Sequence, residues 1–443
     1  MLLQIAYFAY TTVKTIVMTP IRSGYRWTVV SLLFFATTIN YIDRQIISLL
    51  KDDLGKEFNW NEAIYSYIVI AFNSAYALGN VLFGMIIDRI GTKKGYSFSI
   101  VLWSIAAMFH GVVRSTFGFY IARGALGLGE SGNFPSAIKT VAEWFPKKER
   151  ALATGIFNSG TNVGPVIVPG IIYWISHEYS WRAAFIVTGL LGFIWLIFWL
   201  LLYEIPTKKK KVNPAELAYI QSDAPEIILS DEKKIKWVRL LGIRQTWAFV
   251  LGKFFTDPVW WFYLFWIPTY FNSRYHIDLR TSWVYVTVIY GITTVGSVLG
   301  GYLPGFLIGK GWSIYRARKT SMFIYALCVM PVFLVQFTSG VWATVLLISL
   351  ATSAHQAWSA NIFTTASDVF PKSTLSSVIG LGTMAGAVGS IIFPLLIGAI
   401  LDHFKLLGKI TAGYNIIFII CSCAYIIAWV VMHFLTRKKV AGI

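Results

Sequence analysis

Long apolar runs, separated by short polar segments, are the feature of this 443-residue chain that most limits its fold. Each run has about 20 residues or more, the length that an α-helix needs to cross a bilayer. The runs lie at residues 27–50, 64–87, 95–113, 118–142, 151–175 and 182–203, and then at 246–271, 282–309, 320–338, 341–368, 376–400 and 413–435. We therefore predict an all-α integral membrane protein with twelve transmembrane helices in two six-helix halves.

The composition agrees with a membrane protein and excludes several other classes. Hydrophobic residues make up 56% of the chain and charged residues 13%, whereas a soluble domain is about one quarter charged. The net charge of +18 would suggest a nucleic-acid partner for a soluble protein, but here the basic residues lie mostly in short loops. We therefore expect a lipid bilayer around the chain and no nucleic acid.

Cysteine and histidine usage gives no support for a metal, a cofactor or a disulfide framework. Cys328, Cys421 and Cys423 all fall inside predicted helices, and the six histidines show no metal-ligand spacing. An enzyme would also need a nucleophile and base in one cavity, which this pattern does not indicate. We expect no enzymatic activity, no cofactor and no bound metal.

Positive charge predicts the topology. We divide the chain into an N-terminal segment (1–26), a first bundle (27–203), a linker (204–245) with four consecutive lysines at 208–211, a second bundle (246–435) and a tail (436–443). With both ends inside, the cytoplasmic segments hold about 26 of the 38 Lys and Arg residues. Both termini are therefore expected in the cytoplasm. The opening stretch is a poor signal peptide, and translation could begin at Met1 or Met18.

The two halves repeat each other with an offset of about 225 residues. Phe145-Pro146-Lys147 returns as Phe370-Pro371-Lys372, Gly155 as Gly380, Gly164 as Gly389, and Pro169 as Pro394. Duplicated, pseudo-symmetric halves are the architecture of carriers that work by rocking one half against the other.

A charged turn joins the second and third predicted helices. Its acid, Asp88, can pair with basic groups across the bundle and lock one face shut, and its glycines permit close packing. The gating residues are Gly84, Asp88, Arg89, Gly91, Lys93 and Lys94, in a pattern that resembles the signature loop of the major facilitator superfamily. The counterpart in the second half, Gly305 to Lys310, lacks the acid. We expect the lock to be asymmetric.

Charged residues inside the predicted spans need an explanation, because each costs at least about 2.5 kcal/mol on insertion scales. Asp43 and Arg44 are adjacent in the first span. In the fourth, Arg123 and Glu130 are seven residues apart and share a helix face. Lys253 and Asp257 in the seventh are four apart and can pair. These groups either act on a substrate or neutralise one another to hold the bundle together.

The tenth span adds polar side chains that have the same two interpretations. His355 lies next to Gln356 and near Asn361, so it could bind sugar hydroxyls or titrate near neutral pH. An interior histidine satisfied by its own bundle is the alternative.

Three runs carry a more specific resemblance. They are Asn40 to Arg44, Gly129 to Ala151 with its Glu-Ser-Gly-Asn-Phe-Pro segment, and Thr154 to Gly160. Together they resemble the anion:cation symporter family, and most of all its hexuronate transporters. That resemblance implies import of glucuronate or galacturonate with protons.

The resemblance also implies roles for individual residues. Asp43 and Glu130 become the protonation sites, and Tyr41, Arg44 and Arg123 face the anion. Polar side chains of later helices complete the expected substrate site: Asn158, Thr161, Asn162, Lys253, His355, Gln356, Asn361 and Thr383.

We therefore expect a monomeric, proton-coupled symporter in a bacterial inner membrane that carries a small organic anion. An aldonate, an aldarate or a dicarboxylate remains the alternative substrate. A channel or a membrane sensor remains the alternative outside transport, and uphill accumulation driven by a pH gradient would exclude both.

Overall fold

Helices make up nearly all of residues 23–223, 237–277 and 283–436, the ranges that the computed structural model describes, and these ranges contain no β-strand. The first half contains α2 (Tyr25–Leu49), α4 (Glu62–Ile90), α5 (Thr92–His110), α6 (Thr116–Glu130) followed by α7 (Asn133–Trp144), α8 (Lys147–Glu178) and α9 (Trp181–Leu202). The second half contains α12 (Arg244–Tyr275), α13 (Trp283–Gly309), α14 (Ile314–Val329) followed by the 3₁₀ helix η2 (Met330–Phe337), α15 (Val341–Val369), α16 (Leu375–Leu406) and α17 (Ile410–Leu435). Counting α6–α7 and α14–η2 as one span each gives twelve, so the predicted fold class is confirmed.

Four short helices lie outside the spans. They are α3 (Lys51–Phe58), η1 (Pro206–Lys208), α10 (Pro214–Ile220) and α11 (Trp237–Leu240). The last three belong to the predicted linker, part of which lies outside the described residues, as do most of the N-terminal segment and of the basic tail.

Two spans expected to be continuous are interrupted. The fourth breaks at Ser131 and Gly132, where Ser99 Oγ donates a 2.7 Å hydrogen bond to the Gly129 carbonyl. Pro135 has no N–H to continue the helical pattern to Ser131. In the ninth span, Pro331 likewise marks the change from α14 to the tighter η2.

The outer surface of the helices suits a bilayer, and the helices that are less apolar carry the candidate site. Large apolar side chains point outwards, such as Leu201, Phe337 and Leu395, each at least 70% exposed. Within the residues that the structure describes, six helical segments, one of them α14 with η2, are long and apolar enough by themselves to cross a membrane. The helices α2, α6, α8, α12 and α15 fall short of that measure, and they carry all the charged and polar residues of the candidate site except Thr383 of α16.

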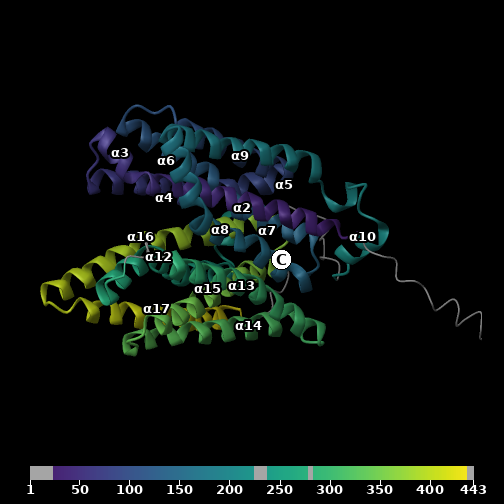
Figure 1. Ribbon diagram of the computed structural model, residues 1–443. Helices are drawn as coiled ribbons and strands as arrows, with labels where there is room; N and C mark the ends of the chain where they lie inside the picture. Colours follow the sequence, from purple (N-terminus) through teal and green to yellow (C-terminus); the bar gives the residue numbers. More distant parts are fainter. Residues whose placement is uncertain (1–22, 224–236, 278–282, 437–443) are drawn as a thin grey trace, which may run out of the picture.

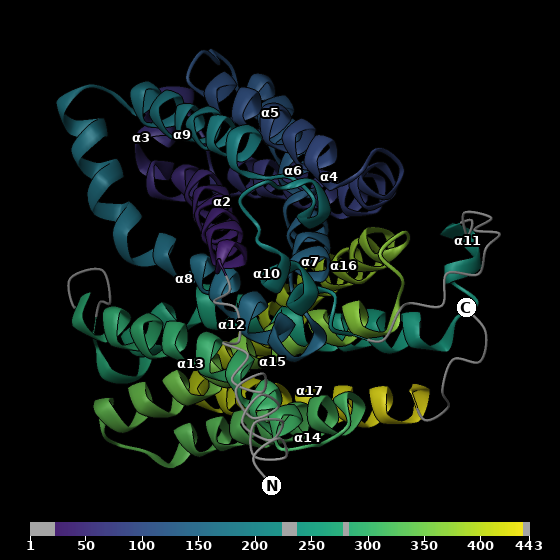
Figure 2. The same ribbon diagram turned by 90° about the vertical axis from the view of Figure 1, so that its right-hand side faces the viewer.

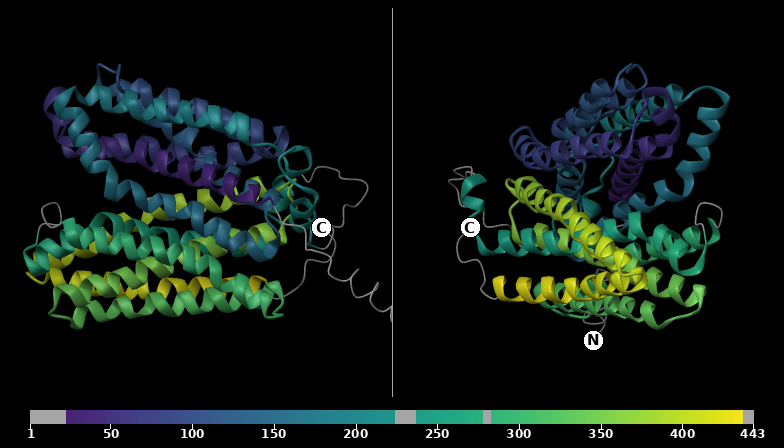
Figure 3. Two further views of the ribbon diagram at one scale, coloured as in Figure 1. Left: turned by 45° about the vertical axis from the view of Figure 1, so that its right-hand side comes forward. Right: turned by 90° about the vertical axis from the view of Figure 1, so that its left-hand side faces the viewer.

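The two bundles lie side by side and meet most closely at one end. In Figure 1 they approach each other near α7 and α10 and spread apart towards the end that carries α3. The turned views show α8 leaning towards the second bundle and α16 towards the first (Figures 2 and 3). We call the end with α10 the linker end.

Glycines allow the helices to touch at the linker end. A Cβ on Gly84 of α4 would lie 2.5 Å from the Ser376 carbonyl oxygen of α16. On the other side, a Cβ on Gly155 of α8 would lie 2.4 Å from the Ser297 carbonyl oxygen of α13. Only residues without a side chain permit such contacts, so these two helix pairs close the linker end.

Candidate functional site

An arginine–glutamate pair lies in the first bundle. Arg44 of α2 donates from Nε (3.0 Å) and Nη2 (2.9 Å) to Glu130 Oε2 at the last residue of α6. Three rings surround its guanidinium, those of Tyr41, Phe72 and Tyr76, at 4.7–5.0 Å from their centroids. This arrangement holds a permanent cation inside a span by charge, hydrogen bonds and ring faces together.

Arg123, also on α6, has a different environment. Its Nη2 donates to the Arg44 carbonyl oxygen (3.3 Å), and its guanidinium lies 4.6 Å from the centroid of the Phe72 ring. Its Nε and Nη1 are buried and make no hydrogen bond within the described residues. Arg123 and Glu130 share a helix face as predicted, but the glutamate bonds to Arg44 because α2 brings that arginine opposite the end of α6. Arg123 therefore keeps unused donors.

Asp43 is the third charged group of this cluster. It is 1% exposed, and neither carboxylate oxygen accepts a hydrogen bond from the part of the chain that the structure describes. Its polar neighbours include Glu130, Arg123 and, from α9, Thr188. Adjacent residues on a helix point about 100° apart, so Asp43 does not pair with Arg44.

A polar network joins the two halves. Gln356 of α15 accepts a 2.5 Å hydrogen bond from Asn158 Nδ2 of α8. The Gln356 Nε2 donates to Asn162 Oδ1 (3.1 Å) and to Thr161 Oγ1 (3.3 Å). Four residues expected at the site, from opposite bundles, therefore meet at one place.

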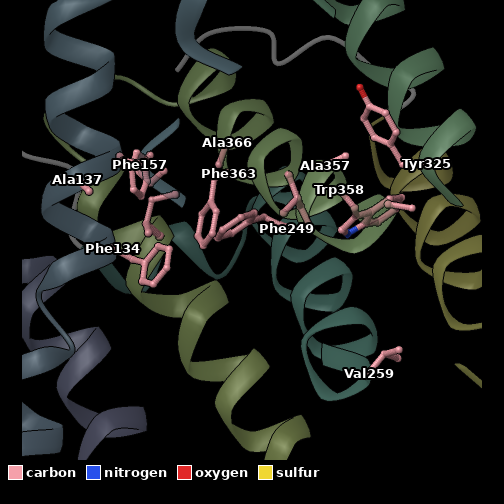
Figure 4. Packing of buried hydrophobic residues seen from close by; sticks show 14 of the residues in the cluster. Phe134, Ala137, Phe157, Phe249, Val259, Tyr325, Ala357, Trp358, Phe363 and Ala366 are labelled. Atoms are coloured by element: carbon pink, nitrogen blue, oxygen red, sulfur yellow. The ribbon is translucent and has the colours of Figure 1, made fainter. Parts of the chain in front are cut away.

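A second ion pair lies in the other bundle. Lys253 Nζ of α12 is 2.8 Å from Asp257 Oδ2 and 4.2 Å from the centroid of the Phe363 ring. Phe363 of α15 stacks on Phe134 of α7 with centroids 5.3 Å apart, and Phe249 of α12 packs beside it (Figure 4). The rings form an apolar bridge between the halves next to the lysine.

Three other expected residues are held within the second bundle. His355 hydrogen-bonds to Tyr425 and stacks on Trp260 (centroids 5.0 Å apart). Asn361 donates to the carbonyl oxygens of Gly300 and Ala357, both at 2.9 Å. Thr383 donates to its own helix at Ile379 (2.8 Å). The interior-histidine alternative thus matches the geometry around His355.

Sequence reasoning missed the aromatic residues of the site. Phe72 and Tyr76 hold the arginines, and Phe134 and Phe363 bridge the halves. Aromatic residues are 16% of the chain, so composition alone does not mark these four. The four-residue spacing of Phe72 and Tyr76, which places both on one helix face, was the available signal.

The residues expected to form the gate lie at the linker end. Asp88 pairs with Lys139 Nζ (2.8 Å) and accepts from the backbone N–H groups of Ser376 (3.2 Å) and Ser377 (2.8 Å). It therefore caps the N-terminus of α16 across the two halves, where the helix dipole favours a negative charge. Gly91 makes the turn at a φ of 88°, Lys93 pairs with Glu204 (3.0 Å), and Arg89 and Lys94 are exposed.

The pseudo-equivalent contact between α8 and the second bundle uses other residues. Arg150 of α8 donates to the Ser367 carbonyl (2.6 Å) and lies 3.6 Å from Asp368, which Arg318 also binds (2.9 Å). The N-terminus of α8 receives its acid from the linker, because Asp223 accepts from the Lys147 N–H (2.9 Å). The two pseudo-equivalent contacts between the halves therefore use different residues.

The family model of the Major Facilitator Superfamily matches residues 33–394. This chain belongs to the major facilitator superfamily. Solved superfamily structures share the fold: the proton:xylose symporter XylE has a TM-score of 0.73 at 15% identity, covering 95% of this chain and 97% of its own. The transporter FucP, in an outward conformation, has a TM-score of 0.68 at 14% identity, covering 94% and 100%.

Curated superfamily relatives are transporters of sugar acids, not enzymes. The hexuronate transporter of Escherichia coli (strain K12) is 30% identical over 420 residues, 94% of this chain and 95% of its own. The galacturonate transporter of Dickeya chrysanthemi is 31% identical over 63% of this chain and 82% of its own. A probable galactarate/D-glucarate transporter of Bacillus subtilis (strain 168) is 29% identical, covering 86% and 87%.

Proposed function

We propose that this chain is a proton-coupled symporter of a bacterial inner membrane, which imports a hexuronate-type sugar acid such as glucuronate or galacturonate by alternating access. The observation that carries the proposal is the cluster in the first bundle. There, Arg123 keeps unused donors beside the Arg44–Glu130 pair, and the buried Asp43 accepts no hydrogen bond from the described residues. The sugar-acid relatives support the substrate class.

The cluster suggests how the anion is bound. A guanidinium presents planar, permanently charged donors that match the two oxygens of a carboxylate. Arg123 has such donors free, whereas Arg44 already uses two on Glu130. The substrate carboxylate therefore binds first at Arg123, and its hydroxyls meet the amides of Asn158, Asn162 and Gln356.

The same cluster suggests the coupling. A buried carboxylate without hydrogen bonds is costly, so Asp43 is suited to accept a proton before the site is carried across. Proton binding at Glu130 would release Arg44, adding a second guanidinium for the anion. Substrate and protons then favour the same loaded state, which is the requirement for symport.

The structure corresponds in this scheme to the state that is closed at the linker end, which we assign to the cytoplasm from the distribution of basic residues. The contact of Asp88 with the N-terminus of α16 and the contact of Arg150 with Asp368 hold that end together. Loading of the site would allow both contacts to separate.

The test is uptake by the purified full chain in proteoliposomes. With an acidic exterior, labelled galacturonate should accumulate above its external concentration, and a protonophore should abolish the accumulation. Competition by glucuronate, galactonate and galactarate would rank the substrates. Simple equilibration without accumulation would favour a channel, and accumulation of only another organic anion would favour that substrate.

A further inference from the structure

The Lys253–Asp257 pair is a group that the coupling scheme does not use. Both residues are on α12, with Nζ and Oδ2 2.8 Å apart. The lysine side chain is 5% exposed and the aspartate side chain 20% exposed. The pair is neutral overall when both members are ionised, and its more accessible member is the acid.

The position of the pair connects it to the candidate site. Lys253 lies against Phe363, which stacks on Phe134 of the first bundle. Asp257 fills the space that Gly386 of α16 leaves, since a Cβ there would lie 2.1 Å from Oδ2. The pair therefore lies beside the aromatic contact between the two halves, across which stands the bundle that carries Tyr41 and Arg44.

We infer that Asp257 is a specificity-determining residue, which favours sugar acids with one carboxylate over those with a carboxylate at each end. This inference rests on the proposed function, in which the first carboxylate binds the arginines. The other end of the same substrate extends towards α12. Hydroxyls there can donate to Asp257 and accept from Lys253, whereas a second carboxylate would meet a like charge.

Without Asp257, the same place would select the opposite substrates. Lys253 would become a buried, uncompensated cation, and a second carboxylate would be the natural partner for it. A lysine without an acidic partner at this place thus predicts binding of an aldarate, whereas a lysine neutralised by an aspartate predicts binding of a hexuronate. The pair, not the lysine alone, decides the class.

The experiment compares binding of galacturonate and galactarate to the purified full chain. The unaltered chain should bind galacturonate at least about tenfold more tightly. Asp257→Asn should shift the ratio of the two dissociation constants at least about tenfold towards galactarate. Asp257→Glu keeps the charge and should keep the preference, and Lys253→Met with Asp257→Asn restores neutrality and should remove the shift. Thermal melting of each variant shows that it is folded.

The outcomes separate the inference from the function on which it rests. If the unaltered chain binds galacturonate and Asp257→Asn leaves the ratio within twofold, the inference is overturned. If Asp257→Asn does not fold, the folded double variant decides: without the Lys253 cation nothing in the pair attracts a second carboxylate, so tighter binding of galactarate than of galacturonate by this variant would contradict charge discrimination. If the unaltered chain binds no sugar acid, the proposed function itself fails.

Discussion

At the residue scale, Glu130 interacts with Arg44 in a way that depends on the charge of its carboxylate. It holds Arg44 through two hydrogen bonds to Oε2, while Oε1 has none from the described residues. The carboxylate is therefore an internal competitor for the guanidinium that an anionic substrate would use. Substituting it tests coupling separately from binding.

Glu130→Gln should keep exchange of labelled galacturonate for unlabelled galacturonate across proteoliposomes and should lose accumulation driven by a pH gradient. The amide resembles the protonated acid but cannot release a proton. Glu57→Gln, an exposed carboxylate paired with Arg182, is the matched control and should accumulate normally. If Glu130→Gln still accumulates the substrate in response to a pH gradient, Glu130 is not the essential coupling residue, and Asp43 becomes the candidate.

Arg123→Lys should raise the dissociation constant for galacturonate about tenfold or more, equivalent to about 1.4 kcal/mol. The lysine keeps the charge but loses the fork that fits a carboxylate. Arg44→Lys should also weaken binding, because the chain loses the second guanidinium, which Glu130 holds through two hydrogen bonds and would release to the anion on protonation. Arg182→Lys, exposed at the α3 end, is the control. Unchanged affinity in both Arg44→Lys and Arg123→Lys would reject binding of the substrate carboxylate by the planar donors of a guanidinium.

At the element scale, one acid connects three helices. Asp88, at the end of α4, bonds to Lys139 of α7 and caps α16 of the other bundle. A cap of this kind contributes about 0.5–2 kcal/mol, and the ion pair adds to it. The contact should therefore set the balance between the closed and open linker end.

Asp88→Asn should shift the chain towards the state that is open at the linker end. Spin labels on cysteines replacing the exposed Lys94 and Ser373, in a background without the native cysteines, should report a longer distance. Asp52→Asn, exposed on α3, should leave the distribution as it is. An unchanged distance in Asp88→Asn would exclude this acid as a lock.

The linker helix α10 adds a pH-dependent contact with α2. Glu216 is buried and accepts from the N–H groups of Tyr25 (2.9 Å) and Arg26 (3.1 Å) and from the Arg26 guanidinium (3.1 Å). Burial would raise the pKa of Glu216, but these hydrogen bonds and one from Ser23 outweigh it and lower the pKa below its usual value. The stabilisation is therefore present above the unfolded pKa, about 4.3, and is lost as pH falls through the lower folded pKa.

Glu216→Gln should accordingly reduce the melting temperature at pH 7, by the loss of about 1–3 kcal/mol of charged hydrogen bonding. The difference from the unaltered chain should shrink as the pH falls below about 4.3. Melting curves from about pH 2 to pH 8, which extend below the unfolded pKa, measure it, with the exposed Glu178→Gln as control. A difference that grows towards acid pH would have the wrong sign for this contact.

At the scale of the whole molecule, the positive charges predict one orientation. The lysines at 208–211 lie in the linker shortly after α9. Glu204, between α9 and these lysines, pairs with Lys93 of the charged turn, so linker and turn lie on the same side. The basic residues of that side should stay in the cytoplasm.

Reporter fusions after Lys211 and after Ile443 should therefore be active with a cytoplasmic reporter and inactive with a periplasmic one. A fusion after Asn59, beyond α3, should show the reverse pattern. Periplasmic activity at either of the first two points would contradict the twelve-helix topology.

The sequence by itself determined the twelve spans and the duplicated halves, and it predicted the charged residues of the candidate site, because hydrophobic length and the cost of buried charge are local properties of a chain. Spacing along a helix also placed Arg123 with Glu130 and Lys253 with Asp257 on common faces. Of these two pairs, only Lys253 and Asp257 form an ion pair within the described residues, since four residues place them one helical turn apart. Arg123 and Glu130 are two turns apart, and Glu130 pairs with Arg44.

Tertiary structure decided which helix met each face. The fold placed Arg44 of α2 at Glu130, the last residue of α6. Packing of α8 against α15 brought Gln356 to Asn158, 198 residues away in the sequence. The break before α7 needed both Pro135 and the Ser99 hydroxyl of another helix. Helical periodicity specifies the direction of a side chain but not its neighbour in the fold, and for that reason these partners came only from the packed bundles.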